Sequence, residues 1–246
     1  MTFEELAWGA FFYQLITDYD ASYKDLLAQA GLLAKLRQDP DAVSPGEFKS
    51  SVINFLNEWG GRHIRKDNDV AEVFLSSLNG LRDKFRSLGD DTLVTINFDH
   101  RGELVQEIFD DLRLISWQNK GSNRNVTVHL GETFASKLAH IMNPSLFVMW
   151  DDAIANHFKK HGMIKSYWDY AGFLKLMQEE ARSVISDFQA SVDDKAPALF
   201  LSNKFGYSVP AALPKFLDEY NWVRSQRNLS VMRPPEWLLR LSRRQS

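Results

Sequence analysis

The stretch from His129 to Phe158, HLGETFASKLAHIMNPSLFVMWDDAIANHF, constrains the fold more than any other part of the chain. Its first half places apolar residues at the spacing of one helix face. Asn143-Pro144 ends this predicted helix, because proline lacks an amide hydrogen and clashes with the preceding turn. Asp151 and Asp152 then offer side-chain oxygens to the free amides at the start of a second helix. The sequence therefore predicts a helix, a tight turn and a second helix whose start holds a carboxylate.

The remainder of the chain is predicted to be almost entirely helical, which gives an all-α fold class and a single domain over residues 1–246. The clearest signal is Ser44-Pro45-Gly46-Glu47, which combines an N-cap serine, a proline at the first helical position and a glutamate that completes a capping box. A β-like run at 92–98 is too short to establish a sheet. The other predicted helices are 3–16, 22–36, 69–87, 102–116, 167–188, 216–227 and 235–243.

Composition narrows the possible chemistry. Of the 246 residues, 44% are hydrophobic and 25% are charged, which is ordinary for a globular protein with a sizeable core. The chain has no cysteine, so disulfides, thiolate catalysis and cysteine-ligated zinc are excluded. The six histidines show no metal-binding spacing such as HExxH, and we expect neither a metal nor a cofactor. No apolar run is long enough for a membrane span and the N-terminus lacks a signal-peptide pattern, so we expect a cytoplasmic protein.

The charge is unevenly distributed. The formal net charge is -3, yet the segment from Asn221 to the end carries six arginines, including Arg240 and Arg243, against one acidic residue. Arg62 begins a second basic segment that directly follows Gly60-Gly61. Local basic faces can bind phosphate even when the whole protein is acidic. Either segment is therefore a candidate DNA contact or an ordinary solvated surface.

The stretch WQNKGSNRN, which starts at Trp117, is the most polar one near the central feature. The amides of Gln118 and Asn119 have the donors and acceptors to read a base edge, and Trp117 has a ring that can stack on a base. Lys120 and Arg124 supply cations for phosphates. A Gly-Ser-Asn loop is equally explained without any ligand.

The central stretch resembles the helix-hairpin-helix superfamily of DNA glycosylases. The matching residues are Gly131, Lys137 within FASKLAH, and Asp151 within LFVMWDDAI. In that family the helix after the hairpin carries a lysine in members that also nick the strand, and an aspartate lies at the start of a following helix. The family hairpin usually reads LPGVGxxTA, whereas HLGETFASKLA keeps one glycine and lacks the second. The resemblance implies two helical lobes with a base pocket between them, and 129–158 as the hairpin-like catalytic stretch.

The resemblance assigns roles to particular residues. An N-glycosidic bond breaks through an oxocarbenium-like sugar, so Asp151 is expected to stabilise that charge or to orient a water. Its alternative role is that of a helix cap alone. Trp150 beside it lines the base pocket or belongs to the core.

Lys137 is predicted to share a helix stripe with Thr133 and His140, away from the apolar face of Phe134 and Leu138. It forms a Schiff base if it is desolvated, and is otherwise a phosphate contact or a solvated lysine. Nothing in the sequence shows that desolvation, so a glycosylase without a lyase step is favoured and the lyase step is left open.

The resulting hypothesis is a monomeric DNA glycosylase for base excision. It would flip a damaged or modified base out of double-stranded DNA and leave an abasic site. The chain is also similar to bacterial glycosylases of antiphage defence that remove glucosylated hydroxymethylcytosine from phage DNA. Two alternatives remain open: a non-catalytic helical protein that binds nucleic acid, and a helical protein-interaction module.

Overall fold

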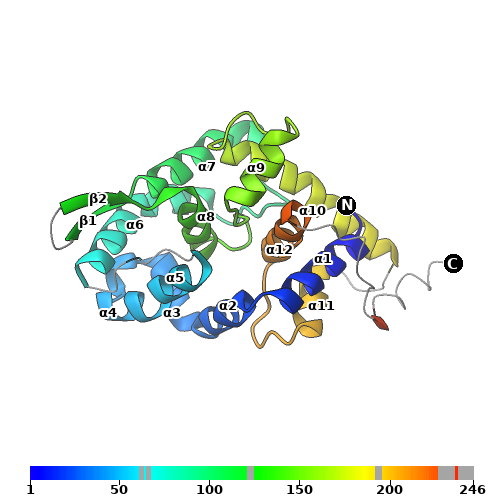
Figure 1. Ribbon diagram of the computed structural model, residues 1–246, viewed down its shortest axis with the longest axis horizontal. Helices are drawn as coiled ribbons and strands as arrows, with labels where there is room; N and C mark the ends of the chain where they lie inside the picture. The colour runs from blue at the N-terminus through cyan, green and yellow to red at the C-terminus, as the bar shows by residue number, and fades with distance from the viewer. Residues whose placement is uncertain (61–63, 65–67, 121–124, 192–195, 227–235, 238–246) are drawn as a thin grey trace.

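The computed structural model describes residues 1–60, 64, 68–120, 125–191, 196–226 and 236–237. These residues are mostly helical, which confirms the predicted class, and a single two-stranded ribbon is the only sheet among them (Figure 1). The helices are α1 (Phe3–Ile16), α2 (Tyr19–Ala28), α3 (Ala30–Gln38), α4 (Pro45–Phe48), α5 (Asn54–Gly60), α6 (Asn68–Leu88), α7 (Phe98–Arg113), α8 (Gly131–Met142), α9 (Asp152–Lys160), α10 (Tyr170–Ser191), α11 (Pro197–Lys204) and α12 (Leu213–Gln226), with a 3-10 turn η1 (Pro40–Ala42), a π-helical segment η2 (Lys49–Ile53) and the strands β1 (Ser116–Lys120) and β2 (Asn125–His129).

The predicted helix starts are largely confirmed. The Ser44 hydroxyl accepts a hydrogen bond from the Glu47 amide at 3.3 Å, and the Glu47 carboxylate accepts one from the Ser44 amide at 3.0 Å. The capping box is therefore formed, and α4, η2 and α5 follow it as one winding segment. The predicted helix over 22–36 is two helices instead, because Gln29 leaves helical geometry with φ -89° and ψ 41°.

The polar stretch after Trp117 forms a β-hairpin rather than the expected loop. β1 and β2 pair antiparallel, with Trp117 opposite Val128 and Gln118 opposite Thr127. The residues that join the strands, 121–124, lie outside the described part of the chain. The run at 92–98 has a β-like composition, but it forms turns and the start of α7 instead of a strand.

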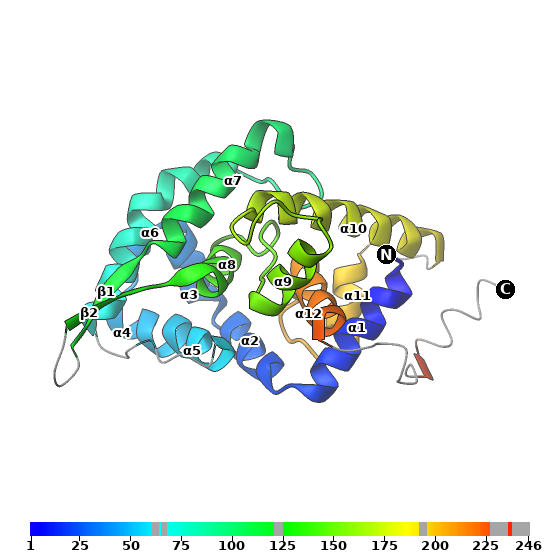
Figure 2. The same cartoon turned by 45° about the horizontal axis from the view of Figure 1, so that its top comes forward.

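The first and last long helices of the described chain lie side by side. α1 runs alongside α12, and α10 and α11 complete this end of the molecule, while α3 to α7 and the hairpin form the other (Figures 1 and 2). α8 and α9 lie between the two groups. One continuous hydrophobic core, which extends from Phe3 to Tyr220, joins them. Within the described residues, no helix has both the length and the apolar character to cross a membrane.

The close approach of α1 and α12 depends on Gly9. A Cβ atom at this position would lie 2.6 Å from Cδ2 and 3.0 Å from Cα of Tyr220, and the second of these atoms belongs to the backbone. Gly9→Ala should therefore lower the free energy of unfolding by about 1 to 3 kcal/mol, because the helices must separate. Urea denaturation followed by circular dichroism measures this.

Gly80→Ala in α6 is the matched control. A Cβ atom there meets nothing within 4 Å. This substitution should raise the free energy of unfolding by about 0.5 to 1 kcal/mol, because alanine has less conformational entropy to lose. Equal effects of the two substitutions would contradict the role assigned to Gly9.

Candidate active site

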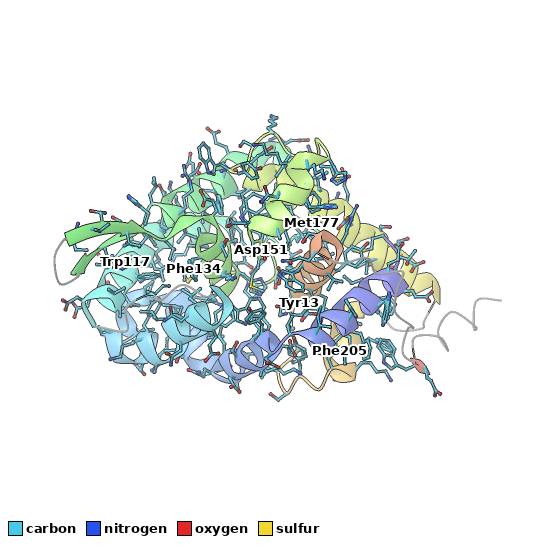
Figure 3. All side chains as sticks on the ribbon, in the orientation of Figure 1. Tyr13, Trp117, Phe134, Asp151, Met177 and Phe205 are labelled. Carbon is cyan, nitrogen blue, oxygen red and sulfur yellow. The ribbon has the colours of Figure 1, made fainter. Side chains whose placement is uncertain are left out.

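Two cavities among the described residues, with volumes of about 420 and 360 Å³, include residues of the predicted catalytic stretch, and only the smaller of them includes Lys137 and Asp151. This smaller cavity is bounded by the start of α8, the start of α9 and the end of α5. Figure 3 places Asp151 and Phe134 near the centre of the molecule, and Trp117 further out toward the hairpin. The lining residues are Trp59, Leu130, Gly131, Glu132, Thr133, Phe134, Lys137, Asp151, Asp152, Ala153 and Gln226.

Asp151 is the N-cap of α9, as predicted. Its backbone is extended, with φ -132° and ψ -179°, and its Oδ1 accepts a hydrogen bond from the Ile154 amide at 2.9 Å. This bond satisfies one of the amides that a helix start leaves free. The side chain is thus held by the backbone while its residue lines the cavity.

Lys137 is buried, so the prediction that it faces away from the apolar side of its helix is wrong. All residues of α8 from Phe134 to Met142 are buried, and Lys137 is only 4% exposed. Its Nζ donates a hydrogen bond to the Trp59 carbonyl oxygen at 2.7 Å. Because α8 lies in the interior, this part of it has no solvated face, and Lys137 lines the cavity instead.

Two aromatic rings flank the Lys137 amine. Its Nζ lies 5.6 Å from the ring centroid of Trp59 and 5.7 Å from that of Phe134. The indole of Trp59 is itself held, since its Nε1 donates to the Tyr19 carbonyl at 2.7 Å and to the Ser22 hydroxyl at 2.9 Å. The cavity therefore has two aromatic walls, one of which is fixed by hydrogen bonds.

Burial controls the electrostatics of this site. Desolvation lowers the pKa of Lys137 to about 8, while the charges of Asp218 and, to a smaller extent, Asp151 act in the opposite direction. Asp218 lies on α12 and is 5% exposed. Desolvation raises the pKa of its carboxyl to about 7, and Lys215 opposes that rise. Lys137 forms no direct ion pair among the described residues, so these charges act on it from a distance.

A second buried lysine lies behind the cavity. Lys215 on α12 has no exposed surface, and its Nζ lies 2.5 Å from Oε1 of Glu219 and 3.9 Å from Oδ1 of Asp20. The same Nζ is 4.8 Å from the ring centroid of Trp59. The Trp59 indole therefore has the Lys137 amine near it in the cavity and the Lys215 amine near it in the core.

His140 is a buried structural residue. One of its ring nitrogens lies 2.7 Å from the Tyr23 hydroxyl, and the other 2.6 Å from the Phe147 carbonyl oxygen. Desolvation lowers its pKa to about 3, so the ring is neutral at physiological pH. Both nitrogens are engaged, and His140 has no part in the cavity.

The predicted base pocket is corrected by the structure. Trp117 is 8% exposed and packs on Phe74 with ring centroids 5.7 Å apart, away from the cavity of Asp151. Gln118 is exposed on β1 and its Nε2 donates to the Thr127 hydroxyl at 2.8 Å. The reason is that a β-hairpin, and not a loop, carries both residues. Trp150 is 1% exposed and belongs to the core, although it also borders a neighbouring cavity.

Most predicted DNA contacts lie outside the described residues. This applies to Arg62, Arg124, Arg240 and Arg243. For Asn119 and Lys120 the structure describes only the backbone of β1.

Sequence reasoning missed several residues of the site or its surroundings, and Glu132 of the cavity wall is one of them. Trp59, Phe134 and Gln226 line the cavity, and Asp218 lies behind it. Trp59 directly precedes a double glycine at a helix end, which is a local signal, but only the tertiary fold brings it to Lys137. Asp218 lies on α12, which is buried from Leu213 to Asn221, whereas an acid on a helix is normally expected at a solvated face.

Comparison with family models, curated proteins and solved structures found no match for this chain. Among the residues that the structure describes, no group of three or more His, Asp or Glu side chains is placed to hold a metal ion.

The burial of Lys137 can be measured directly. In protein labelled with 13C on lysine, the Cε resonance of Lys137 should titrate with a midpoint near pH 8, because burial disfavours the ammonium form. Lys137→Arg, which lacks this resonance, provides the assignment. A midpoint at the ordinary lysine value of about 10.4 would contradict the buried position.

The Asp218 charge should be visible in the same titration. Asp218→Asn should move the Lys137 midpoint further down, because the carboxylate favours the ammonium form. Asp152→Asn is the control and should leave the midpoint unchanged, since Asp152 lines the cavity but is not among the charges acting on Lys137.

Proposed function

We propose that this protein is a DNA glycosylase that hydrolyses the N-glycosidic bond of a flipped, damaged or modified base. One observation carries the proposal: the carboxylate of Asp151 and the buried amine of Lys137 line one cavity that also has two aromatic walls. Hydrolysis of this bond requires a carboxylate and a site for a planar ring, and a lyase step after it would also require an amine.

The role proposed for Asp151 follows from charge. As the bond between sugar and base breaks, positive charge develops on the sugar ring, and a nearby carboxylate stabilises it or takes a proton from the attacking water. The base leaves with the bonding electron pair, and the water oxygen adds to the anomeric carbon. Because Oδ1 of Asp151 is held by the Ile154 amide, the carboxylate is positioned before substrate binds.

The aromatic walls support a planar ligand. A base that leaves the DNA stack loses its stacking partners, and the rings of Trp59 and Phe134 can replace them. These two residues take the place that the sequence assigned to Trp117. The cavity volume of about 360 Å³ falls in the range of small-molecule sites.

The burial of Lys137 favours a lyase step after base release. A lysine amine attacks a sugar carbon only in its neutral form, and desolvation makes that form accessible near neutral pH. The amine would add to C1′ of the open-chain sugar and lose water to give a Schiff base. Loss of a proton from C2′ would then break the bond between C3′ and the phosphate oxygen and release the 3′ phosphate. This desolvation is the feature that the sequence alone did not show.

The first prediction for function concerns Asp151→Asn. Asparagine is also a good N-cap, so the variant should keep the stability of α9 while base release falls roughly 100-fold or more. The assay incubates duplex DNA that carries uracil, oxidised, alkylated or glucosylated bases and measures the released base. Asp83→Asn, at an exposed aspartate on α6 away from the cavity, is the control and should retain activity.

Base release by Asp151→Asn at the wild-type rate would contradict the proposed role of Asp151. Absence of release from every duplex, with salt-dependent DNA binding intact, would support the non-catalytic alternative instead.

The second prediction tests Lys137 by borohydride trapping on duplex DNA that contains an abasic site. Borohydride reduces a Schiff base to a stable amine, so wild-type protein should become covalently linked to the DNA and Lys137→Met should not. Trapping should rise with pH through about 8 as the amine loses its proton. Lys35→Met, at an exposed lysine on α3, is the control and should trap like wild type.

A further inference from the structure

A second cavity adjoins the candidate active site. It has a volume of about 250 Å³ and shares Glu132, Asp151 and Asp152 with the first cavity. Its opposite side is formed by Tyr167 and Trp168, in the connection between α9 and α10. Figure 2 shows α9 with this connection beside α8 and α12. The two cavities therefore adjoin at these three acidic residues.

The indole of Trp168 is exposed but held in place. It is 56% exposed, although its Nε1 donates to Oε1 of Glu132 at 2.8 Å. Its backbone is fixed as well, since its carbonyl accepts from Gln106 at 2.7 Å and its amide donates to the Ser166 hydroxyl at 3.2 Å. An exposed ring that is already ordered loses little entropy when a ligand stacks on it. Tyr167 beside it is 41% exposed.

Cations flank these rings. Nζ of Lys159 lies 3.7 Å from the Tyr167 ring centroid, and the guanidinium of Arg113 lies 5.4 Å from that of Trp168. Lys160 and Lys165 are exposed on the same segment. Neither they nor Lys159 forms an ion pair with another described residue, whereas Arg113 is paired with Asp110 at 2.8 Å.

The acidic and the basic side chains around this cavity favour different groups of a ligand. Glu132, Asp151 and Asp152 make the cavity wall acidic, which repels a phosphate but accepts the donor groups of a neutral base. Lys159, Lys160 and Lys165 make the adjoining surface basic, which attracts phosphates. Aromatic rings with cations beside them are the combination that binds single-stranded nucleic acid.

We propose that Tyr167, Trp168 and the three lysines bind a segment of the flipped strand that has come unpaired next to the flipped nucleotide, with a base of that segment stacked on Trp168. The inference rests on the proposed function for its choice of DNA, but the binding itself requires no catalysis. The phosphates of this strand lie over the lysines, and the flipped nucleotide enters the first cavity past Asp151.

The test measures binding of a fluorescein-labelled, unmodified single-stranded DNA oligonucleotide by fluorescence anisotropy. Trp168→Ala should raise the dissociation constant roughly 5- to 150-fold, as expected when one base stack is removed. Trp168→Phe keeps a stacking ring and should restore most of the affinity. Leu199→Ala on α11, which removes a similarly exposed apolar side chain elsewhere, is the control and should bind like wild type.

The contribution of the lysines is measured by the salt dependence of binding. The double substitution Lys160→Ala and Lys165→Ala should weaken binding and reduce the slope of log affinity against log salt by about 0.7 for each phosphate that a lysine no longer neutralises. Lys35→Ala on α3 should leave the slope unchanged. Equal dissociation constants for wild type and Trp168→Ala would overturn the proposal.

The two proposals fail in different ways. If the wild-type protein releases a base but Trp168→Ala binds single strands like wild type, the glycosylase proposal is supported and the proposal of a stacking surface is contradicted. If single-strand binding depends on Trp168 but no duplex loses a base, the stacking surface is supported and the glycosylase proposal is contradicted.

Discussion

The buried ion pair between Lys215 and Glu219 is the interaction on which the site depends. Neither side chain has exposed surface, and each would be very unfavourable in the interior without the other. Burial raises the pKa of Glu219, and the Lys215 charge opposes this rise. Both residues lie on α12, one turn apart, and residues of α1 and α2 help to bury them. Gly9 permits the close approach of α1 and α12, since it leaves room for the backbone of Tyr220.

Two contacts connect this ion pair to the cavity, one from Lys215 to Trp59 and one from Trp59 to Lys137. Nζ of Lys215 lies 5.0 and 5.1 Å from the ring centroids of Tyr13 and Tyr23, and 4.8 Å from that of Trp59. The Trp59 carbonyl then accepts the hydrogen bond from Lys137. The chemistry proposed for Lys137 is thus supported by side chains from both ends of the chain. An isolated stretch 129–158 would hold its acid but would leave its lysine solvated.

The sequence predicted the elements well and their environment poorly. Capping and proline signals located the starts of α4 and α9 and the end of α8, because these depend on nearby residues. Asp151 was found for the same reason, since its cap bond spans three residues. The burial of Lys137 was missed because it depends on α5 and α12, which lie far away in the chain. The hairpin was missed because its strands are polar and short, and their pairing compensates for weak strand propensity.

Glu132, Asp151 and Asp152 form a wall that two cavities share. A larger side chain at one of these positions that points into one cavity reduces the volume of that cavity and not of the other. Glu132 in particular also anchors the Trp168 indole, so it cannot be exchanged for fit alone. A substitution in this wall that admits a bulkier ligand to one cavity would therefore also change the other cavity, so that a change of ligand at this site would require paired substitutions.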